Sequence, residues 1–133
     1  MAHLKVTEVA DSDDPRSTII EMVGDLSDYH VLGSRVLVGT YIASRMTKGG
    51  IWRPEKSIDE DRWQGKVGLV LKMGPMAFKY DGSFAYEGTK PEIGQWVEYR
   101  PAETSEVGIR GAPCRYIDSQ NIRAVIPDPS LIY

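Results

Sequence analysis

Very few side chains in this sequence have the types and spacings that carry out chemistry. The two histidines, His3 and His30, lie near no serine or cysteine in a recognisable nucleophile setting, and no His/Cys cluster has metal-ligand spacing. The single cysteine, Cys114, excludes an intrachain disulfide, and its place among predicted strand residues favours a buried structural thiol over a nucleophile. The carboxylates of residues 59–61 lack the spacing of a calcium loop, which favours a solvated loop. We therefore predict a non-catalytic protein without a cofactor or a metal site.

The residues that stand out instead are suited to binding a partner. The stretch Gly49-Gly50-Ile51-Trp52-Arg53-Pro54 places isoleucine and tryptophan behind two glycines, within a mostly polar segment. Apolar side chains on such a segment gain little from packing within the chain, so we interpret these six residues as a loop that docks on another protein. The alternative is that Trp52 folds back and covers the end of its own domain, and the sequence leaves both interpretations open.

Two predicted strands position this docking loop. Residues 35–42 are rich in β-branched and aromatic side chains, which is typical of a strand. In residues 65–73 apolar side chains alternate with others, as in a half-buried strand, and only Val70 is out of phase. Residues 44–64 separate the two strands. Loops of roughly twenty residues in compact domains are usually functional or disordered.

Further short strands follow along the chain. We expect them at residues 95–100, 107–109, 114–117 and 121–126, with a small hairpin within residues 76–90 that turns at Asp81-Gly82. Short strands at regular spacing, without a second long helix, indicate an all-β domain in the form of a small barrel. We place this barrel at residues 31–126.

Both ends of the chain lie outside the predicted barrel. Residues 1–30 form an acidic extension, in which Asp14 as N-cap and Gly24 as a stop predict a helix over residues 15–23. Its apolar face would consist of Ile19, Ile20 and Val23. A helix this short is not stable alone, so it must pack on its own barrel or on a neighbour. Residues 127–133 form a tail that prolines keep out of the sheet, and its apolar end, Leu131, Ile132 and Tyr133, indicates docking on a neighbour.

Four features of residues 31–126 follow one another in a fixed order. They are a strand followed by the long loop with Gly49-Gly50-Ile51, the strand GKVGLVLKMG at residues 65–74, the turn IGQWV at residues 93–97, and the closing strand NIRAVI at residues 121–126. In this order they resemble the GroES-type co-chaperonins, and most of all the GroES-like proteins encoded by bacteriophages. The resemblance implies a small GroES-like irregular β-barrel with a long loop, a short N-terminal helix and extended terminal arms.

The resemblance also implies how the chain assembles. In that family seven subunits form a ring in which the last strand of one subunit meets the first strand of the next, and the loop docks on a chaperonin. By this resemblance the subunit seam would involve Val36, Val38, Ile122 and Ala124. The docking tripeptide of the family is apolar, whereas the tripeptide Ile51-Trp52-Arg53 carries a guanidinium that is costly to desolvate without a partner.

Composition and charge limit the partners. The chain has 133 residues, 41% of them apolar, and a net charge of −3, so we expect one globular domain without attraction to nucleic acid or to anionic membranes. No stretch is long and apolar enough to span a membrane, and the N-terminus lacks the apolar core of a signal peptide. We therefore expect the protein in a virion or in the cytoplasm of the host cell, not secreted by a signal peptide.

Two functions fit these features. The favoured one is an assembly protein of a bacteriophage particle, a homo-oligomer that decorates, cements or connects the capsid by binding a capsid or other virion protein. Arg53 and the two terminal arms favour it, because a chaperonin lid needs neither. The alternative is a phage-encoded co-chaperonin whose ring forms a lid on the host chaperonin to assist protein folding. There each loop would bind the chaperonin ring weakly, and all loops together would bind it tightly.

Overall fold

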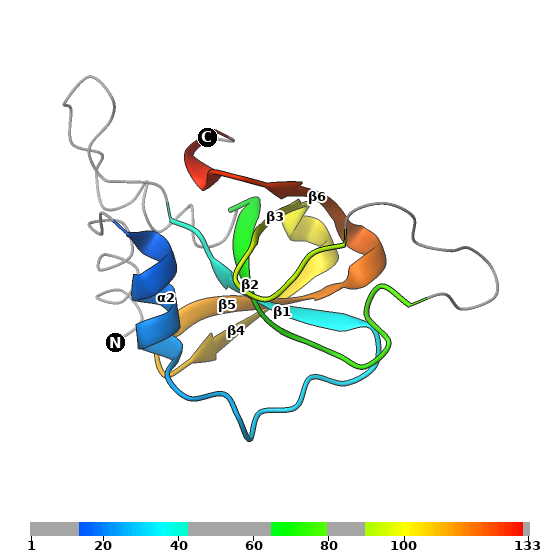
Figure 1. Ribbon diagram of the computed structural model, residues 1–133, viewed down its shortest axis with the longest axis horizontal. Helices are drawn as coiled ribbons and strands as arrows, with labels where there is room; N and C mark the ends of the chain where they lie inside the picture. Colours follow the sequence, from blue (N-terminus) through cyan, green and yellow to red (C-terminus); the bar gives the residue numbers. More distant parts are fainter. Residues whose placement is uncertain (1–13, 43–64, 80–89, 132–133) are drawn as a thin grey trace.

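A computed structural model describes residues 14–42, 65–79 and 90–131 of the chain, which form one antiparallel sheet with a short helix (Figure 1). The elements in chain order are α2 (Pro15–Val23), β1 (Arg35–Thr40), β2 (Val67–Met73), β3 (Trp96–Tyr99), η1 (Pro101–Glu103), β4 (Thr104–Ile109), β5 (Ala112–Asp118), η2 (Ser119–Asn121), β6 (Ile122–Ile126) and η3 (Pro129–Leu131). The predicted helix and the six strands are therefore confirmed, while residues 80–89 of the predicted hairpin lie outside the described residues.

The six strands form a single sheet in the order β4-β5-β1-β2-β3-β6, and every neighbouring pair is antiparallel. The all-β prediction is thus confirmed. The closed barrel is not confirmed, because within the described residues β4 and β6 end the sheet and no pairing joins them. In Figure 1 β6 lies towards the top of the view and β4 towards the bottom.

The helix α2 packs on one face of this sheet. Of the two alternatives for this helix, contact with its own domain or with a neighbouring chain, the structure shows the first. Its N-cap is Asp14, whose carboxylate accepts hydrogen bonds from the Ser17 amide (3.3 Å) and hydroxyl (2.7 Å). Its end is Gly24, which has a φ of 69° and donates its N–H to the Ile20 carbonyl (3.2 Å). The buried side of α2 consists of Ile19, Met22 and Val23. Ile20, predicted on the apolar face, is 48% exposed, so that part of the prediction is wrong.

The sheet is buried on both faces at its centre. One apolar cluster lies under α2 and includes Leu37, Leu69 and Trp96. The second cluster lies on the opposite face and includes Val38, Val70 and Val97. The second cluster explains why Val70 breaks the alternation of its strand, because both faces of β2 have apolar neighbours.

The contact between α2 and the sheet is close enough to require a glycine. A Cβ atom at Gly39 of β1 would clash with the Cγ2 atom of Ile19 and would also touch Leu71. The helix therefore lies directly on the backbone of β1, where any larger residue would push it away.

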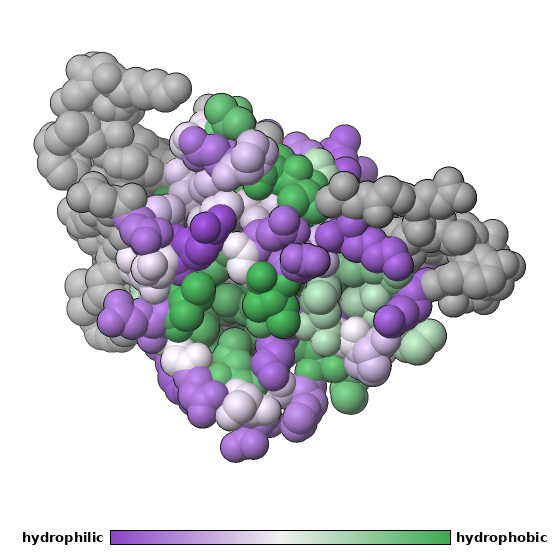
Figure 2. Space-filling view, viewed as in Figure 1, coloured by the Kyte–Doolittle hydropathy of each residue, from purple (hydrophilic) through white to green (hydrophobic). Residues whose placement is uncertain are grey.

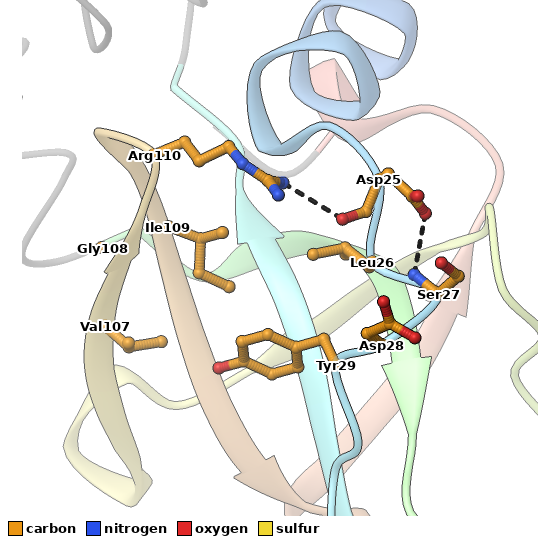
Figure 3. Close-up of a pocket in the computed structure, with 9 residues that line it drawn as sticks. All are labelled: Asp25, Leu26, Ser27, Asp28, Tyr29, Val107, Gly108, Ile109 and Arg110. Carbon is orange, nitrogen blue, oxygen red and sulfur yellow. Dashed lines mark hydrogen bonds between the residues drawn. The ribbon is translucent and has the colours of Figure 1, made fainter.

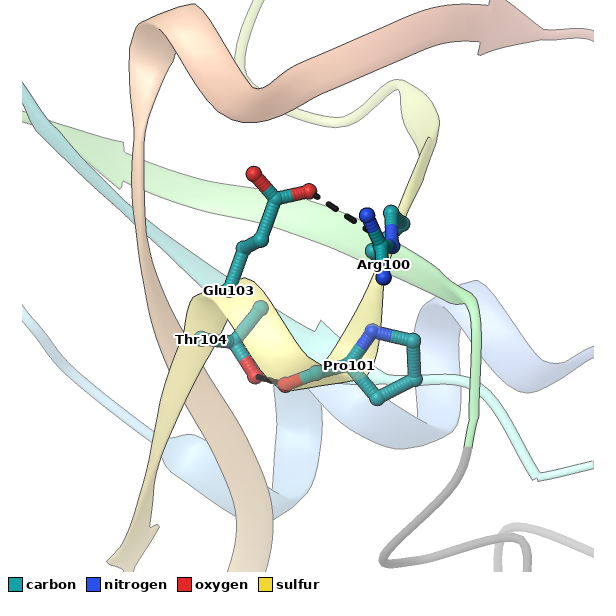
Figure 4. Close-up of polar contacts among 4 residues, drawn as sticks. All are labelled: Arg100, Pro101, Glu103 and Thr104. Carbon is teal, nitrogen blue, oxygen red and sulfur yellow. Dashed lines mark hydrogen bonds and ion pairs between the residues drawn. The ribbon is translucent and has the colours of Figure 1, made fainter.

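Two sets of side-chain contacts lie where the chain passes from β3 to β4, at the far end of the sheet. In the corner at η1 the Thr104 hydroxyl donates to the Pro101 carbonyl (2.7 Å), and Arg100 pairs with Glu103 at 3.9 Å (Figure 4). That ion pair is exposed and contributes little stability. The buried Arg115 guanidinium of β5 donates to the Thr104 hydroxyl (2.8 Å), which ties the start of β4 to its neighbour.

Candidate interaction surface

Most of the predicted docking residues fall outside the described part of the chain. This holds for Gly49-Gly50-Ile51-Trp52-Arg53-Pro54 and for Ile132 and Tyr133, so their roles stay predictions. Leu131 is described and ends η3 with its side chain 68% exposed. Of the three predicted tail-docking residues, Leu131 is therefore the one that the structure describes, and its apolar side chain is largely in contact with solvent.

The predicted subunit seam is divided between the centre and the end of the sheet. Val36 and Val38 are fully buried in β1, which pairs with β2 on one side and with β5 on the other. The resemblance implies that the first strand meets a neighbouring subunit, but β5 of the same chain already pairs with that edge of β1, so the edge is not open. Ile122 and Ala124 lie in β6, the terminal strand, and both are half-buried.

The terminal strands β4 and β6 are the positions where the sheet could grow. In the described part of the chain, β4 pairs only with β5, and β6 pairs only with β3. The outer edge of such a strand presents backbone N–H and C=O groups that are ready to pair with another strand. Neither strand contains a proline, and each has a single charged side chain, Glu106 in β4 and Arg123 in β6.

A cleft of about 530 Å³ lies beside β4, between residues 25–29 and residues 107–110 (Figure 3). We call it the hairpin cleft. Arg110 closes one end of it, because its guanidinium donates to the backbone carbonyls of Val23 and Asp25 and so joins the β4–β5 hairpin to the end of α2. The hydrogen bonds that Ser27 makes to the Asp25 carboxylate lower the pKa of that carboxyl. Apolar side chains also line the cleft, namely Leu26, Val107 and Ile109.

The position of Arg110 depends on the turn of the hairpin. Ile109 pairs with Ala112, so only Arg110 and Gly111 form the loop, and both have positive φ angles of 50° and 82°. Such a two-residue loop matches the twist of the strands that it joins. The predicted strands at residues 107–109 and 114–117 left residues 110–113 between them, so Arg110 was not recognised as a turn residue.

A second cleft of about 340 Å³ lies beside the other end of β4. We call it the Arg35 cleft, and it is lined by His30, Val31, Leu32, Arg35, Ser105 and Tyr116. The Tyr29 and Tyr116 hydroxyl groups are in hydrogen-bond contact, and these two residues line different clefts. Burial and this hydrogen bond raise the pKa of Tyr29 to about 12, so the phenol is neutral near pH 7. Both clefts therefore offer apolar surface with a few polar groups at the ends.

The thiol of Cys114 lines neither cleft. Cys114 of β5 is fully buried, and burial raises the pKa of its thiol to about 12, which keeps it protonated and unreactive. Among residues 14–42, 65–79 and 90–131, no group of three His, Cys, Asp or Glu side chains could hold a metal ion. What the arrangement offers is surface for binding: two strand edges, two clefts and exposed apolar side chains. On the face shown in Figure 2, hydrophobic residues gather near the middle of the view, where Figure 1 draws β4 and β5, and hydrophilic residues border them.

Comparison with known proteins adds no relative to this picture. No protein-family model and no curated protein matches the chain. The resemblance to GroES-type proteins therefore rests on the order of the sequence features alone. A separate finding is that no helix in the described residues is long and apolar enough to cross a membrane.

Sequence reasoning missed the clefts altogether. Tyr29 and Tyr116 are 87 residues apart in the chain, and so are Arg110 and Val23. No local pattern links residues at such separations, because the pairing of β4, β5 and β1 brings them together. The one signal that could have been used is Arg110-Gly111, since a glycine between two predicted strands marks a tight turn.

Proposed function

We propose that this chain has a GroES-like fold and serves as a non-catalytic assembly protein of a bacteriophage particle. In this role it forms a homo-oligomer that decorates, cements or connects the capsid, and it binds a capsid or other virion protein without a cofactor. The observation that carries the proposal is the terminal strand β6. It is apolar at four of its five positions, it has one partner in the described residues, and it leads to the exposed Leu131.

The two terminal strands favour head-to-tail contact between copies. If β6 paired with β6 of a second copy, the two Arg123 side chains would come close together, and like charges opposite each other destabilise a strand pair. Self-pairing of β4 would likewise bring the two Glu106 side chains together, although each already lies opposite Arg115 of β5. Pairing of β4 with β6 of the next copy brings opposite charges together instead. Contacts of this head-to-tail kind close into rings.

The docking loop is the second part of the proposal. β1 and β2 are antiparallel neighbours, so the end of β1 and the start of β2, which flank residues 43–64 in the chain, lie at the same end of the sheet. This supports a loop that projects from one end of each subunit, as the resemblance implies. We propose that Ile51 and Trp52 bury apolar surface on the partner and that Arg53 meets a carboxylate or a carbonyl there.

Sedimentation velocity over a range of protein concentrations tests the contact between copies. Arg123 lies at the register shift of β6 and has no partner residue on β3, so Arg123→Pro removes a backbone N–H at a position where no residue pair between β6 and β3 is lost. We expect the wild type to form oligomers and Arg123→Pro to weaken association about tenfold or more. The matched control, Arg123→Ala, keeps the N–H and should associate nearly as well as the wild type. A wild type that stays monomeric at every concentration contradicts the proposal.

A second candidate function is a co-chaperonin lid on the host chaperonin, and the pairing of β1 with β2 around residues 43–64 also favours it. Pull-downs on a chaperonin ring and on stripped phage particles distinguish the two. In an apolar chaperonin groove Arg53 would be desolvated without a counter-ion, so Arg53→Leu should strengthen binding there. On a particle Arg53→Leu should weaken binding, because losing one member of a buried charge pair costs about 2–5 kcal/mol. Tight, nucleotide-dependent binding of the wild type to chaperonin alone would decide for the lid.

A further inference from the structure

We propose that the Arg35 cleft is the binding site for residues 127–131 of a second copy of this chain. The proposal rests on the head-to-tail pairing of β4 with β6 proposed above, and it adds what the chain does beyond the end of β6. The site combines His30, Leu32, Arg35 and Tyr116 from one copy. The ligand is the segment of the next copy that contains Asp128 and Leu131.

The direction of the strands leads residues 127–131 to this cleft. Five antiparallel pairings separate β4 from β6 in the sheet order, so the two strands run in opposite directions. When β6 of one copy continues the sheet beside β4 of another, the pair is therefore antiparallel. The end of β6 then lies beside the start of β4, at Thr104 and Ser105. Ser105 is the residue of β4 that lines the Arg35 cleft.

The same segment does not reach the cleft of its own copy. β6 and β4 end opposite sides of the sheet, with four strands between them, and η3 lies on the side of the molecule away from β4 in Figure 1. The cleft and the segment that fits it thus belong to different ends of one subunit. This is the arrangement expected of a head-to-tail contact.

The charges of the two surfaces are complementary. Arg35 is exposed, and no ion pair joins its guanidinium to another of the described residues. Its cross-strand neighbour is Asp118, whose two carboxylate oxygens accept hydrogen bonds from Ser34 (2.8 Å) and the Gln120 amide (3.0 Å). Asp128 is also exposed, and it is the only charged residue between Arg123 and the end of η3. A carboxylate entering a cleft lined by Arg35 and His30 meets two hydrogen-bond donors.

The apolar parts of the two surfaces match as well. Leu32 at the rim of the cleft is 69% exposed, and Leu131 is 68% exposed, which makes them the two most exposed large apolar residues in the described part of the chain. Exposed apolar side chains of this size mark interaction sites when they gather beside polar groups. Seating Leu131 against Leu32 and Val31 removes both exposed leucines from water in a single contact.

A charge exchange tests the proposal in the full chain. Arg35→Glu and Asp128→Lys should each weaken self-association about tenfold, since each replaces an attraction by a repulsion. The double variant should regain most of the loss, which a merely structural role of either residue would not produce. Asp128 also accepts hydrogen bonds from the Ser130 amide (2.9 Å) and hydroxyl (2.8 Å), so Asp128→Asn, which keeps an acceptor oxygen, separates the loss of charge from the loss of that turn.

The outcomes separate this proposal from the proposed function. If the wild type assembles, Arg123→Pro breaks the assembly and the exchanged charges have no effect, the head-to-tail contact stands and the role of the Arg35 cleft is overturned. If the single variants lose binding to particles but not self-association, the occupant of the cleft is another protein and the proposal is wrong. If the wild type never assembles, both proposals fail. Rescue by the double variant supports the cleft as the site.

Discussion

The centre and the two ends of the sheet use apolar residues in different ways. In β1 and β2 the apolar side chains lie on both faces and are almost completely buried, against α2 on one side and a second cluster on the other. In β6 the apolar side chains are half-buried, and in η3 Pro129 is buried whereas Leu131 is exposed. The difference indicates two tasks in one sheet. The centre holds the subunit together, while its ends keep apolar surface that would be buried only by another chain.

The largest difference is expected from truncating one leucine in each region. Leu37→Ala in the fully buried β1 should lower the free energy of unfolding by about 2–5 kcal/mol, because it removes packed atoms and leaves a cavity. Leu131→Ala makes the same chemical change at an exposed position and should alter stability by less than about 0.5 kcal/mol. Urea denaturation of both variants, at a concentration where the subunit is monomeric, measures this. Equal losses in the two variants would mean that Leu131 belongs to the subunit core.

A smaller difference is expected from adding a methyl group to a glycine in each region. Gly39→Ala in β1 places a Cβ atom against Ile19 of the helix and should cost about 1–3 kcal/mol. Gly108→Ala in β4 meets nothing within 4 Å, so it should be neutral or slightly stabilising. Thermal unfolding followed by far-UV circular dichroism compares the pair. A tolerant Gly39→Ala would show that α2 can shift on the sheet without loss, which is opposite to what the close contact indicates.

The sequence predicted the centre of the molecule better than its ends, for a physical reason. Strands, the helix and its caps are local patterns, so Asp14, Gly24 and the alternation of β2 were enough to place them. The order of the strands is not local. The insertion of β5 beside β1, which buries Val36 and Val38 and moves the open edge to β4, depends on pairings across more than 70 positions of sequence, such as Val36 with Ile117.

The candidate site divides in the same way. Leu131 was named because an apolar tail is visible in a linear pattern, whereas Ile122 and Ala124 were named only through the resemblance to the GroES-type proteins. The clefts were not predicted from the sequence, since Arg35, Tyr29 and Tyr116 come together only after the sheet has formed. Val70 shows the limit of the periodicity rule, because in β2 a single residue out of phase was the trace of the second buried face.

The smallest expected effect is a loss of stability at alkaline pH. It should begin at a lower pH for Cys114, at the buried centre, than for Tyr29, beside β4. Burial raises the pKa of the Cys114 thiol from 9.0 to about 12, and burial with the Tyr116 hydrogen bond raises the pKa of Tyr29 from 10.0 to about 12. In both cases the folded chain holds the proton more tightly than the unfolded chain does. Their stabilising contributions are therefore complete below pH 9.0 and 10.0 respectively, and each is lost as the pH rises towards about 12.

Single substitutions distinguish the contribution of the Cys114 thiol from that of the Tyr29 phenol. Cys114→Ala, at the buried centre, should flatten the decline of stability from pH 9.0 upward, whereas Tyr29→Phe, beside β4, should flatten it only above pH 10.0. We expect the larger change from Cys114→Ala, because that thiol is fully buried while Tyr29 keeps part of its ring in solvent. Urea midpoints measured at a series of pH values give the slopes. Since slopes are compared within each variant, any constant loss from the cavity that Cys114→Ala leaves cancels. A Tyr29→Phe variant that flattens the curve as early as Cys114→Ala would place Tyr29 in the subunit core, and the contrast between the centre of the sheet and its ends would then not extend to the clefts.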